Sequence, residues 1–253
     1  MLEAFATTLG SYAPPLAAGA CVLAAGASCG YYATYAVRSQ WLGPADWRGR
    51  EDSSAVALTF DDGPGEDTVR VLDVLNARGA SATFFMVGRQ AEAYATTARR
   101  VAAEGHEVGN HSYSHPIYLY RSARETRRQL ARAQDAIEGA TGVRPRFSRP
   151  PCGVRSPAYF RAARALELRT VQWSVAGFDW KRIGAREIAR HVLKDARAGS
   201  IILLHDGDSE GRDGRAETVA ALPLILDGLS ERGLNVAPLS RLLGIEEGAA
   251  EVR

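Results

Sequence analysis

From Ser54 onward, short apolar runs alternate with stretches in which apolar residues recur every three or four positions. Runs such as that at 55–60 are typical of buried strands, whereas Val71, Leu72 and Leu75 share one face of a helix. We predict strands over residues 55–60, 82–87, 106–109, 146–148, 169–174, 200–204 and 235–238. We predict helices over residues 67–77, 91–104, 122–141, 157–166, 185–196 and 217–232.

Strands separated by helices at this spacing indicate an α/β fold with a parallel sheet and helical crossovers. A barrel and an open, doubly wound sheet both fit the pattern. The residues with reactive side chains follow predicted strands: Asp61 and Asp62, His111, Arg149, Asp179 and His205. In a (β/α) barrel such positions all converge on the C-terminal face. We therefore predict a distorted (β/α) barrel of about seven parallel strands.

The N-terminal region is apolar, with no charged residue over 12–37. As a helix it is long enough to span about 30 Å of hydrocarbon, although Pro14-Pro15 would break a helix near its start. A cleaved signal peptide fits less well, because Glu3 stands where a basic residue is expected. We favour membrane association through residues 12–37, with a signal peptide and a soluble extension as alternatives.

Composition excludes several classes of protein. At 253 residues and 46% apolar, the chain can bury one full core. The net charge is +2 and no block of like charge occurs, so we expect no nucleic-acid partner. Cys21, Cys29 and Cys152 form no CxxC motif, which excludes a zinc ribbon. Nucleotide-binding motifs are absent from strand–loop–helix contexts.

Asp61 and Asp62 place two adjacent carboxylates at the end of an apolar strand. Successive strand residues point to opposite faces, but the turn at Gly63-Pro64 could bring both into one cavity. Two close carboxylates repel unless cations offset them, so a metal on one and an arginine beside the other is a physical solution. The alternative is an Asx turn that ends the strand.

His111 and His115 stand four residues apart, and on a helical turn they would share a face. Two imidazoles with a carboxylate suit zinc, and three protein ligands leave a position open for catalysis. Unrelated surface histidines are the alternative. The chain has five histidines in all, which weakens that alternative.

Arg149–Gly153 is a proline-rich loop after a predicted strand. Its arginine could bracket a carboxylate with two hydrogen bonds, and its glycine would let the backbone approach a ligand; a plain turn is the alternative. His205 ends an apolar strand, where a buried core histidine is common. Asp179 offers a carboxylate that could keep a histidine protonated, unless it is merely exposed beside a packing Trp180.

In their order, these segments resemble the motifs of the polysaccharide deacetylase family, known also as the NodB-homology or carbohydrate esterase family 4 domain. The likeness runs from about residue 54 to residue 240. The matched motifs are TFDDG at Thr59–Gly63, HxxxH at His111–His115, RxPxG at Arg149–Gly153, the pair Asp179-Trp180, and LxH at Leu203–His205.

The resemblance implies metal-dependent hydrolysis of N-acetyl groups from an oligo- or polysaccharide that contains N-acetylglucosamine, either peptidoglycan-like or chitin-like. It implies zinc, or alternatively cobalt, nickel or manganese. The implied roles are general base for Asp61, metal ligands for Asp62, His111 and His115, orientation of Asp61 for Arg149, general acid for His205, tuning of His205 for Asp179, and substrate binding for Cys152, Trp180 and Leu203. Leu203 and Trp180 would line the pocket for the acetyl methyl, and the Cys152 N–H would bind the oxyanion.

Two residues depart from the family pattern. Cys152 stands where members often have an aromatic residue beside the sugar groove, and Ala176 stands where many carry a further aspartate. Alternative functions are cleavage of a small non-sugar amide or O-acetyl ester, and an inactive carbohydrate-binding relative. Asp61 and His205 argue against inactivity, because binding alone would not need them.

Composition and the resemblance together suggest the domain organisation: an apolar N-terminal segment over residues 1–40 that we expect to be a membrane anchor, a linker over 41–53 and a catalytic domain over 54–245. An enzyme of this kind would lie at the cell membrane or envelope with its catalytic domain outside the cytoplasm. Arg38, Arg48 and Arg50 follow the apolar segment and, by the positive-inside rule, favour the opposite orientation.

Overall fold

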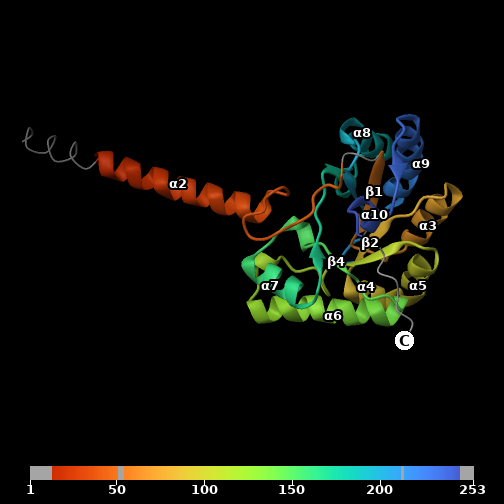
Figure 1. Ribbon diagram of the computed structural model, residues 1–253, viewed down its shortest axis with the longest axis horizontal. Helices are drawn as coiled ribbons and strands as arrows, with labels where there is room; N and C mark the ends of the chain where they lie inside the picture. Colours follow the sequence, from red (N-terminus) through yellow and green to blue (C-terminus); the bar gives the residue numbers. More distant parts are fainter. Residues whose placement is uncertain (1–12, 51–53, 212–213, 246–253) are drawn as a thin grey trace, which may run out of the picture.

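The computed structural model describes residues 13–50, 54–211 and 214–245. Within these ranges, a sheet of short parallel strands is surrounded by helices (Figure 1). The strands are β1 (Ala55–Asp61), β2 (Thr83–Met86), β3 (Glu107–Asn110), β4 (Phe147–Ser148), β5 (Arg169–Thr170), β6 (Val175–Ala176), β7 (Ile201–His205) and β8 (Asn235–Val236). The α-helices are α2 (Ala13–Tyr35), α3 (Thr68–Ala77), α4 (Gly88–Ala93), α5 (Ala95–Ala103), α6 (Ala123–Thr141), α7 (Pro157–Ala165), α8 (Ala185–Asp195), α9 (Ala216–Glu231) and α10 (Leu239–Leu242). Three 3-10 turns complete the elements: η1 (Tyr118–Tyr120), η2 (Pro151–Gly153) and η3 (Asp179–Lys181).

The sheet curls on itself. Its strand order is β5-β4-β3-β2-β1-β7-β6, and β8 pairs with the beginning of β1. The two edge strands follow each other directly in the chain: Arg169 pairs with Phe147 of β4, and Ala176 pairs with Leu203 of β7. One short segment therefore contacts both edges, and the sheet forms the distorted half-barrel that the sequence predicted.

The same segment corrects one detail of the prediction. We expected a single strand over residues 169–174, but the structure has β5 and β6 with a bend between them. The reason is a change of partner: the Val171 N–H donates to Ser148 at 2.8 Å, whereas the Ser174 N–H donates to Ile201 at 3.0 Å. No continuous ladder is possible where the chain crosses from one sheet edge to the other.

Alternation along β1 separates the two cores. Leu58 and Phe60 point outward into the main core, which the helices cover, while Ala57 points into the barrel. Leu239 and Leu242 of α10 pack against Ala57 and fill the barrel near the start of β1. The opposite end of the barrel, at the C-terminal ends of the strands, is left for polar side chains.

The helices follow one another around the barrel, with α8, α9, α3, α5, α6 and α7 packed in succession. Helix α6 is capped at both ends, by the Ser122 hydroxyl, which accepts from the Glu125 N–H, and by Gly142 in the left-handed conformation. The single helix expected over 91–104 is two helices, because Tyr94 leaves the helical conformation (ψ 42°) between α4 and α5.

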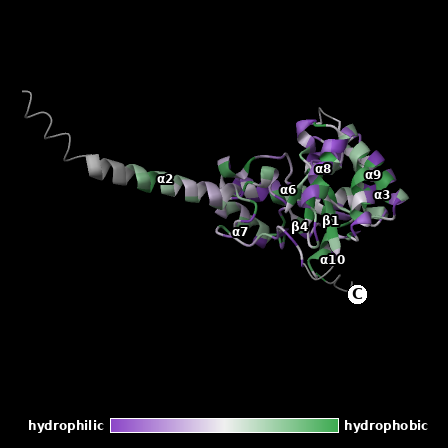
Figure 2. Cartoon of the chain, turned by 90° about the horizontal axis from the view of Figure 1, so that it is seen from above, coloured by the Kyte–Doolittle hydropathy of each residue, from purple (hydrophilic) through white to green (hydrophobic). Residues whose placement is uncertain are grey.

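Helix α2 extends away from the rest of the chain in two perpendicular views (Figures 1 and 2). Pro14 and Pro15 do not break it, because they lie in its first turn. The N–H groups of a first turn have no acceptor within the helix, so the N–H that proline lacks is not needed there. Across the described ranges, no helix is both long and apolar enough to cross a membrane. The predicted membrane association through residues 12–37 thus finds no support, and residues 1–12 lie outside the described part.

The segment before β1, which we predicted as a linker over 41–53, runs along the sheet. Asp46 forms a parallel bridge with Val171, and Arg48 forms an antiparallel bridge with Ser200. Residues 51–53 lie outside the described ranges. The domain boundaries at 41 and 54 stay a prediction.

Candidate active site

Asp61 and Asp62 lie together at the C-terminal end of β1, and both are buried. Neighbouring strand residues would point to opposite faces, but Asp62 has a left-handed backbone (φ 74°). This conformation ends the strand and turns the second carboxylate, so that both carboxylates line one pocket. The predicted common cavity is thus present, and it is produced by Asp62 itself, before the glycine and proline that follow.

His111 and His115 converge with a ring-centroid separation of 5.0 Å. The helical turn that we expected between them is wrong, because Ser112 (φ 69°) and His115 (φ 59°) have left-handed backbones. Side chains hold this loop: the Asn110 amide oxygen accepts from the Ser112 N–H, and the Ser112 hydroxyl accepts from the His115 N–H, both at 2.9 Å. A non-helical loop therefore provides the proximity that we had assigned to helical spacing.

Asp62, His111 and His115 could hold a metal ion. Their ligand atoms lie within 4.8 Å of one another, with Asp62 Oδ1 at 3.1 Å from His115 Nε2 and 3.5 Å from His111 Nε2. Asp62 Oδ1 is buried without a hydrogen-bond donor, and His111 Nδ1 lies 2.8 Å from the Arg149 carbonyl, which directs Nε2 toward Asp62. Two imidazole nitrogens and an unsatisfied carboxylate oxygen fit a divalent cation. Elsewhere among the described residues, no other such cluster occurs.

The electrostatics of two of these three residues, Asp62 and His115, agree with that use. For His111, burial lowers the pKa, but the carboxylates of Asp61 and Asp62 outweigh burial and raise it. Burial raises the pKa of Asp62, but the imidazoles of His111 and His115 outweigh burial and lower it well below its usual range. Burial, reinforced by His111, lowers the pKa of His115 to about 4. An ionised carboxylate and a neutral imidazole are the forms that bind metals.

Arg149 is fully buried beneath Asp61, at the end of β4. Its Nη1 donates to Asp61 Oδ1 at 2.7 Å and to the Thr59 hydroxyl at 2.8 Å, and its Nη2 donates to the Gln172 carbonyl at 3.0 Å. The guanidinium lies 4.2 Å from the centre of the Phe85 ring. Burial lowers the pKa of Arg149, against the opposing charge of Asp61. The arginine fixes one oxygen of Asp61, and the other, Oδ2, lies 3.7 Å from His111 Nε2.

His205 ends β7 and forms two contacts with Asp179. Its Nδ1 lies 2.9 Å from Asp179 Oδ1, and its backbone N–H donates to Oδ2 at 2.7 Å. The Thr218 hydroxyl also donates to Oδ2, at 2.8 Å. Burial lowers the pKa of His205, but Asp179 outweighs burial and raises it to about 9. At neutral pH, His205 is therefore an imidazolium, able to give up a proton.

These side chains surround a pocket of about 330 Å³. Eight of the ten residues singled out in the sequence line it: Asp61, Asp62, His111, His115, Cys152, Trp180, Leu203 and His205. Arg149 and Asp179 lie behind it, in contact with Asp61 and His205. The structure thus brings all ten together, with a triad that could hold a metal and with Asp61 and His205 lining the same pocket.

Residues 48–171 match the family model described as polysaccharide deacetylase. The chitooligosaccharide deacetylase of Azorhizobium caulinodans is 36% identical over 198 residues, which are 75% of this chain and 94% of that protein. A peptidoglycan-N-acetylglucosamine deacetylase of Bacillus cereus is 36% identical over 209 residues, 79% of this chain and 93% of that protein. The chain belongs to the polysaccharide deacetylase family. Its named relatives are deacetylases, hydrolases of carbon–nitrogen bonds, and the chain is an enzyme of this class.

Solved structures of polysaccharide deacetylases agree with the fold. The Bc1960 peptidoglycan N-acetylglucosamine deacetylase superimposes with a TM-score of 0.76 at 34% identity, over 80% of this chain and 94% of that one. A CE4 family pseudoenzyme from Bacillus anthracis gives 0.72 at 31% identity, over 79% of this chain and 68% of that one.

Trp173 is a pocket residue that the sequence did not reveal. It lies in the bend between β5 and β6 and lines the polysaccharide deacetylase pocket beside Gly153. A Cβ on Gly153 would lie 2.7 Å from the Trp173 ring, and the glycine has φ 68°, so only glycine fits there. One sequence feature could have indicated this role: Trp173 is an aromatic residue near the end of the segment that we predicted as a continuous strand.

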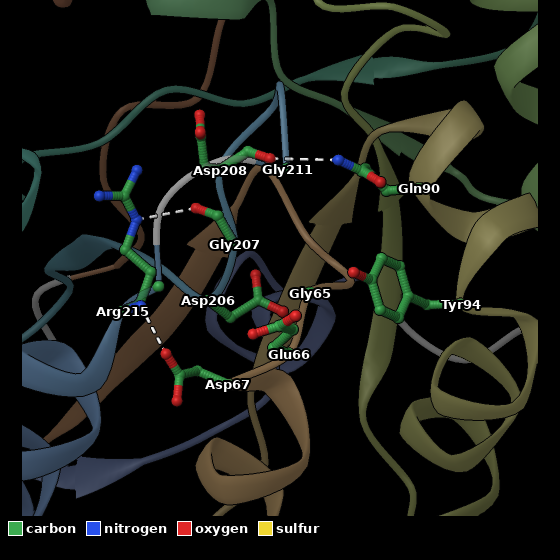
Figure 3. A pocket seen from close by; sticks show the side chains of 11 residues that line it. Gly65, Glu66, Asp67, Gln90, Tyr94, Asp206, Gly207, Asp208, Gly211 and Arg215 are labelled. Atoms are coloured by element: carbon green, nitrogen blue, oxygen red, sulfur yellow. Dashed lines mark hydrogen bonds between the residues drawn. The ribbon is translucent and has the colours of Figure 1, made fainter.

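The loop after His205 is held by hydrogen bonds to neighbouring segments (Figure 3). Asp206 is buried and its Oδ2 accepts from the Thr68 hydroxyl at 2.6 Å, while burial raises its pKa to about 7. Farther along, Arg215 Nε donates to the Gly207 carbonyl at 2.8 Å. These contacts hold the chain after His205, and the pairing of β7 with β1 and β6 holds it before His205.

Proposed function

We propose that this enzyme removes N-acetyl groups from N-acetylglucosamine units of an oligo- or polysaccharide, peptidoglycan-like or chitin-like, with the help of a divalent metal. One observation carries the proposal: Asp61 and the protonated His205 line the same pocket as the triad of Asp62, His111 and His115. The names of the relatives, which are chitooligosaccharide and peptidoglycan deacetylases, support the choice of substrate.

Zinc is the metal that we favour, with cobalt, nickel or manganese as alternatives, because one carboxylate and two imidazoles suit these ions. When bound, the metal supplies Lewis acidity, which lowers the pKa of water from about 16 to about 7 and polarises a carbonyl. Asp62, His111 and His115 would hold it and leave part of its coordination open to the pocket.

Asp61 would act as the general base. Arg149 holds Asp61 Oδ1, so that the second oxygen remains available to accept a proton from the attacking water. The oxygen of that water forms a bond to the acetyl carbonyl carbon. Because the guanidinium is held by Thr59 and Gln172 as well, Asp61 has one preferred orientation.

The substrate's acetyl group would be bound from two sides. Leu203 and Trp180 offer apolar surface for the methyl, and both line the pocket. The backbone N–H of Cys152 would donate to the developing oxyanion. An amide with a larger acyl group would meet Leu203, which is almost completely buried.

His205 would act as the general acid. Its pKa of about 9 keeps it protonated at neutral pH, and its Nδ1 is occupied by Asp179, so Nε2 delivers the proton. The proton passes to the amide nitrogen as the carbon–nitrogen bond breaks. Acetate and the free amine of the sugar are the products.

The decisive experiment is an acetate-release panel with N-acetylglucosamine oligomers, peptidoglycan and small amides and acetyl esters, with and without a chelator. We expect acetate from the sugars, abolished by the chelator. Turnover of small amides or esters with none of any sugar would favour the alternative function, and no turnover at all would favour an inactive binding protein.

Asp61→Asn separates chemistry from binding. The amide retains an acceptor for Arg149 but cannot take a proton at neutral pH. We expect acetate release to fall by about a hundredfold or more with oligomer binding retained, and the melting temperature to fall as well, because the buried Arg149 charge loses its ionised partner. Full activity in this variant would refute the mechanism.

We also propose that the catalytic domain works outside the cytoplasm, in the cell envelope, where a cell-wall polymer is accessible. The arginines that favour the opposite orientation have contacts within the fold: Arg48 donates to the Ala198 carbonyl, and Arg38 lies 4.7 Å from the Trp47 ring centre. A reporter that is active on one side of the membrane only, fused after Arg50, tests this. Activity on the cytoplasmic side would contradict the proposal.

A further inference from the structure

The C-terminal end of α2 is fastened to the loop that carries Cys152. The Arg155 N–H donates to the Thr34 carbonyl at 3.3 Å, and the Arg155 guanidinium donates to the carbonyls of Ala36 at 2.5 Å and Val37 at 3.2 Å. Arg155 is 1% exposed. A buried arginine thus sets the position of a helix whose remaining described side chains are largely exposed.

Three tyrosines gather where α2 meets the domain, and we call them the tyrosine row: Tyr31, Tyr35 and Tyr120. The rings of Tyr31 and Tyr35 are stacked, with centroids 4.9 Å apart and planes at 17°. The neighbouring Tyr120 raises the pKa of Tyr35. Tyr31 is 67% exposed and Tyr120 is 72% exposed. The row therefore presents aromatic faces and hydroxyl groups to solvent.

The row is connected through the chain to two loops of the candidate catalytic pocket. Tyr120 follows His115 by five residues, through the short turn η1. Thr34, the neighbour of Tyr35, accepts a hydrogen bond from the N–H of Arg155, three residues after Cys152. Cys152 itself lines the pocket. The two loops that supply His115 and Cys152 to the site therefore both lead to the row.

We propose that the tyrosine row is a sugar-binding subsite, on which rings of a long N-acetylglucosamine polymer stack beyond the unit that is deacetylated. This rests on the proposed function and extends it from single sugars to extended chains. A sugar ring has an apolar face and a hydroxylated edge, and a row of tyrosines offers apolar ring faces with hydroxyls at their edges. Cys152 provides no aromatic surface, and the row supplies one next to it. The matched family model begins at residue 48, so α2 lies outside the matched region.

The experiment measures kcat/KM for acetate release as a function of oligomer length, from the dimer to the hexamer. The variants are Tyr31→Ala and Tyr120→Ala, singly and together, since both side chains are mostly exposed. We expect the double variant to lose about tenfold in kcat/KM on the hexamer, through KM, and to match wild type on the dimer. Tyr31→Phe and Tyr120→Phe should retain most of the kcat/KM on the hexamer, because the aromatic ring is kept.

Val22→Ala is the matched control, because Val22 is exposed on the same helix about two and a half turns before the row. It should leave all substrates unaffected. No loss in the tyrosine variants, or an equal loss at every length, would overturn the proposal. Loss of vesicle binding or of self-association with unchanged hexamer kinetics would assign the row to a membrane surface or to a second copy, and would overturn it too.

Different results would contradict the proposed function and the proposed subsite. If wild-type protein releases no acetate from any oligomer, the proposed function fails. Hexamer binding to Asp61→Asn protein, followed by calorimetry with and without the tyrosine substitutions, still tests the row in that case. Equal affinities there would overturn the subsite alone.

Discussion

Asp179 holds His205 by its ring and by its backbone at once. One carboxylate oxygen lies 2.9 Å from Nδ1, and the other accepts from the His205 N–H at 2.7 Å. The carboxylate therefore fixes both the orientation of the ring and its charge. Burial would lower the pKa of His205, so its value of about 9 depends on Asp179.

Asp179→Asn should move the pH profile. The folded pKa of His205 is raised, so the acid is present at low pH and is lost as pH rises through about 9. Without the carboxylate, this basic limb of kcat/KM should move down by about one pH unit or more, and activity should fall at neutral pH. Acetate release measured against pH checks this.

Thr218→Val is the control for that shift. It removes the hydroxyl that donates to Asp179 at 2.8 Å but keeps the carboxylate beside His205. Its basic limb should stay near that of wild type. An unchanged limb in Asp179→Asn would mean that another group supplies the proton.

Removal of the metal should abolish activity reversibly. His115→Ala removes a ligand, so the metal content should fall, and the loss of activity should exceed the tenfold to hundredfold that is typical of groups around a ligand. Elemental analysis and acetate release during a zinc titration measure both effects. His191→Ala, a histidine on α8 that does not line the pocket, should retain metal and activity.

Arg149→Met should destabilise the fold. It leaves the buried Asp61 charge without its partner, which costs about 3–5 kcal/mol of unfolding free energy. Urea denaturation measures it. Arg78→Ala breaks an ion pair with Asp227 at the surface and should cost less than about 1 kcal/mol. Similar costs for the two variants would show that the buried pair has no special role in stability.

Leu203→Ala should relax acyl selectivity. The substitution enlarges the pocket where we place the acetyl methyl, so turnover of N-propionyl relative to N-acetyl sugar should rise about tenfold. The neighbouring Leu204 faces the outer core, and Leu204→Ala should lower stability without changing the ratio. A ratio unchanged by Leu203→Ala would place the acyl group elsewhere.

The sequence alone determined the fold class, the family and which side chains gather at the candidate site. Strand and helix periodicity are local properties, so the elements could be placed within a few residues. The reactive groups follow strands that are also local runs, as Asp61 follows 55–60 and His205 follows 200–204. Parallel strands end at one edge, so their convergence could be deduced without coordinates.

Only the tertiary structure decided how these groups meet. Asp62, Ser112 and His115 have left-handed backbones, which the residue types alone do not predict. These conformations turn the candidate metal ligands toward one point. The change of partner between β5 and β6 brings Trp173 to the pocket, and buried Arg155 joins α2 to the Cys152 loop. The strand change and the Arg155 contacts depend on segments far apart in the chain, which no local sequence pattern records. The loop from Ser112 to His115 is held locally, by Asn110 and Ser112, but its conformation is not one that the sequence pattern predicts.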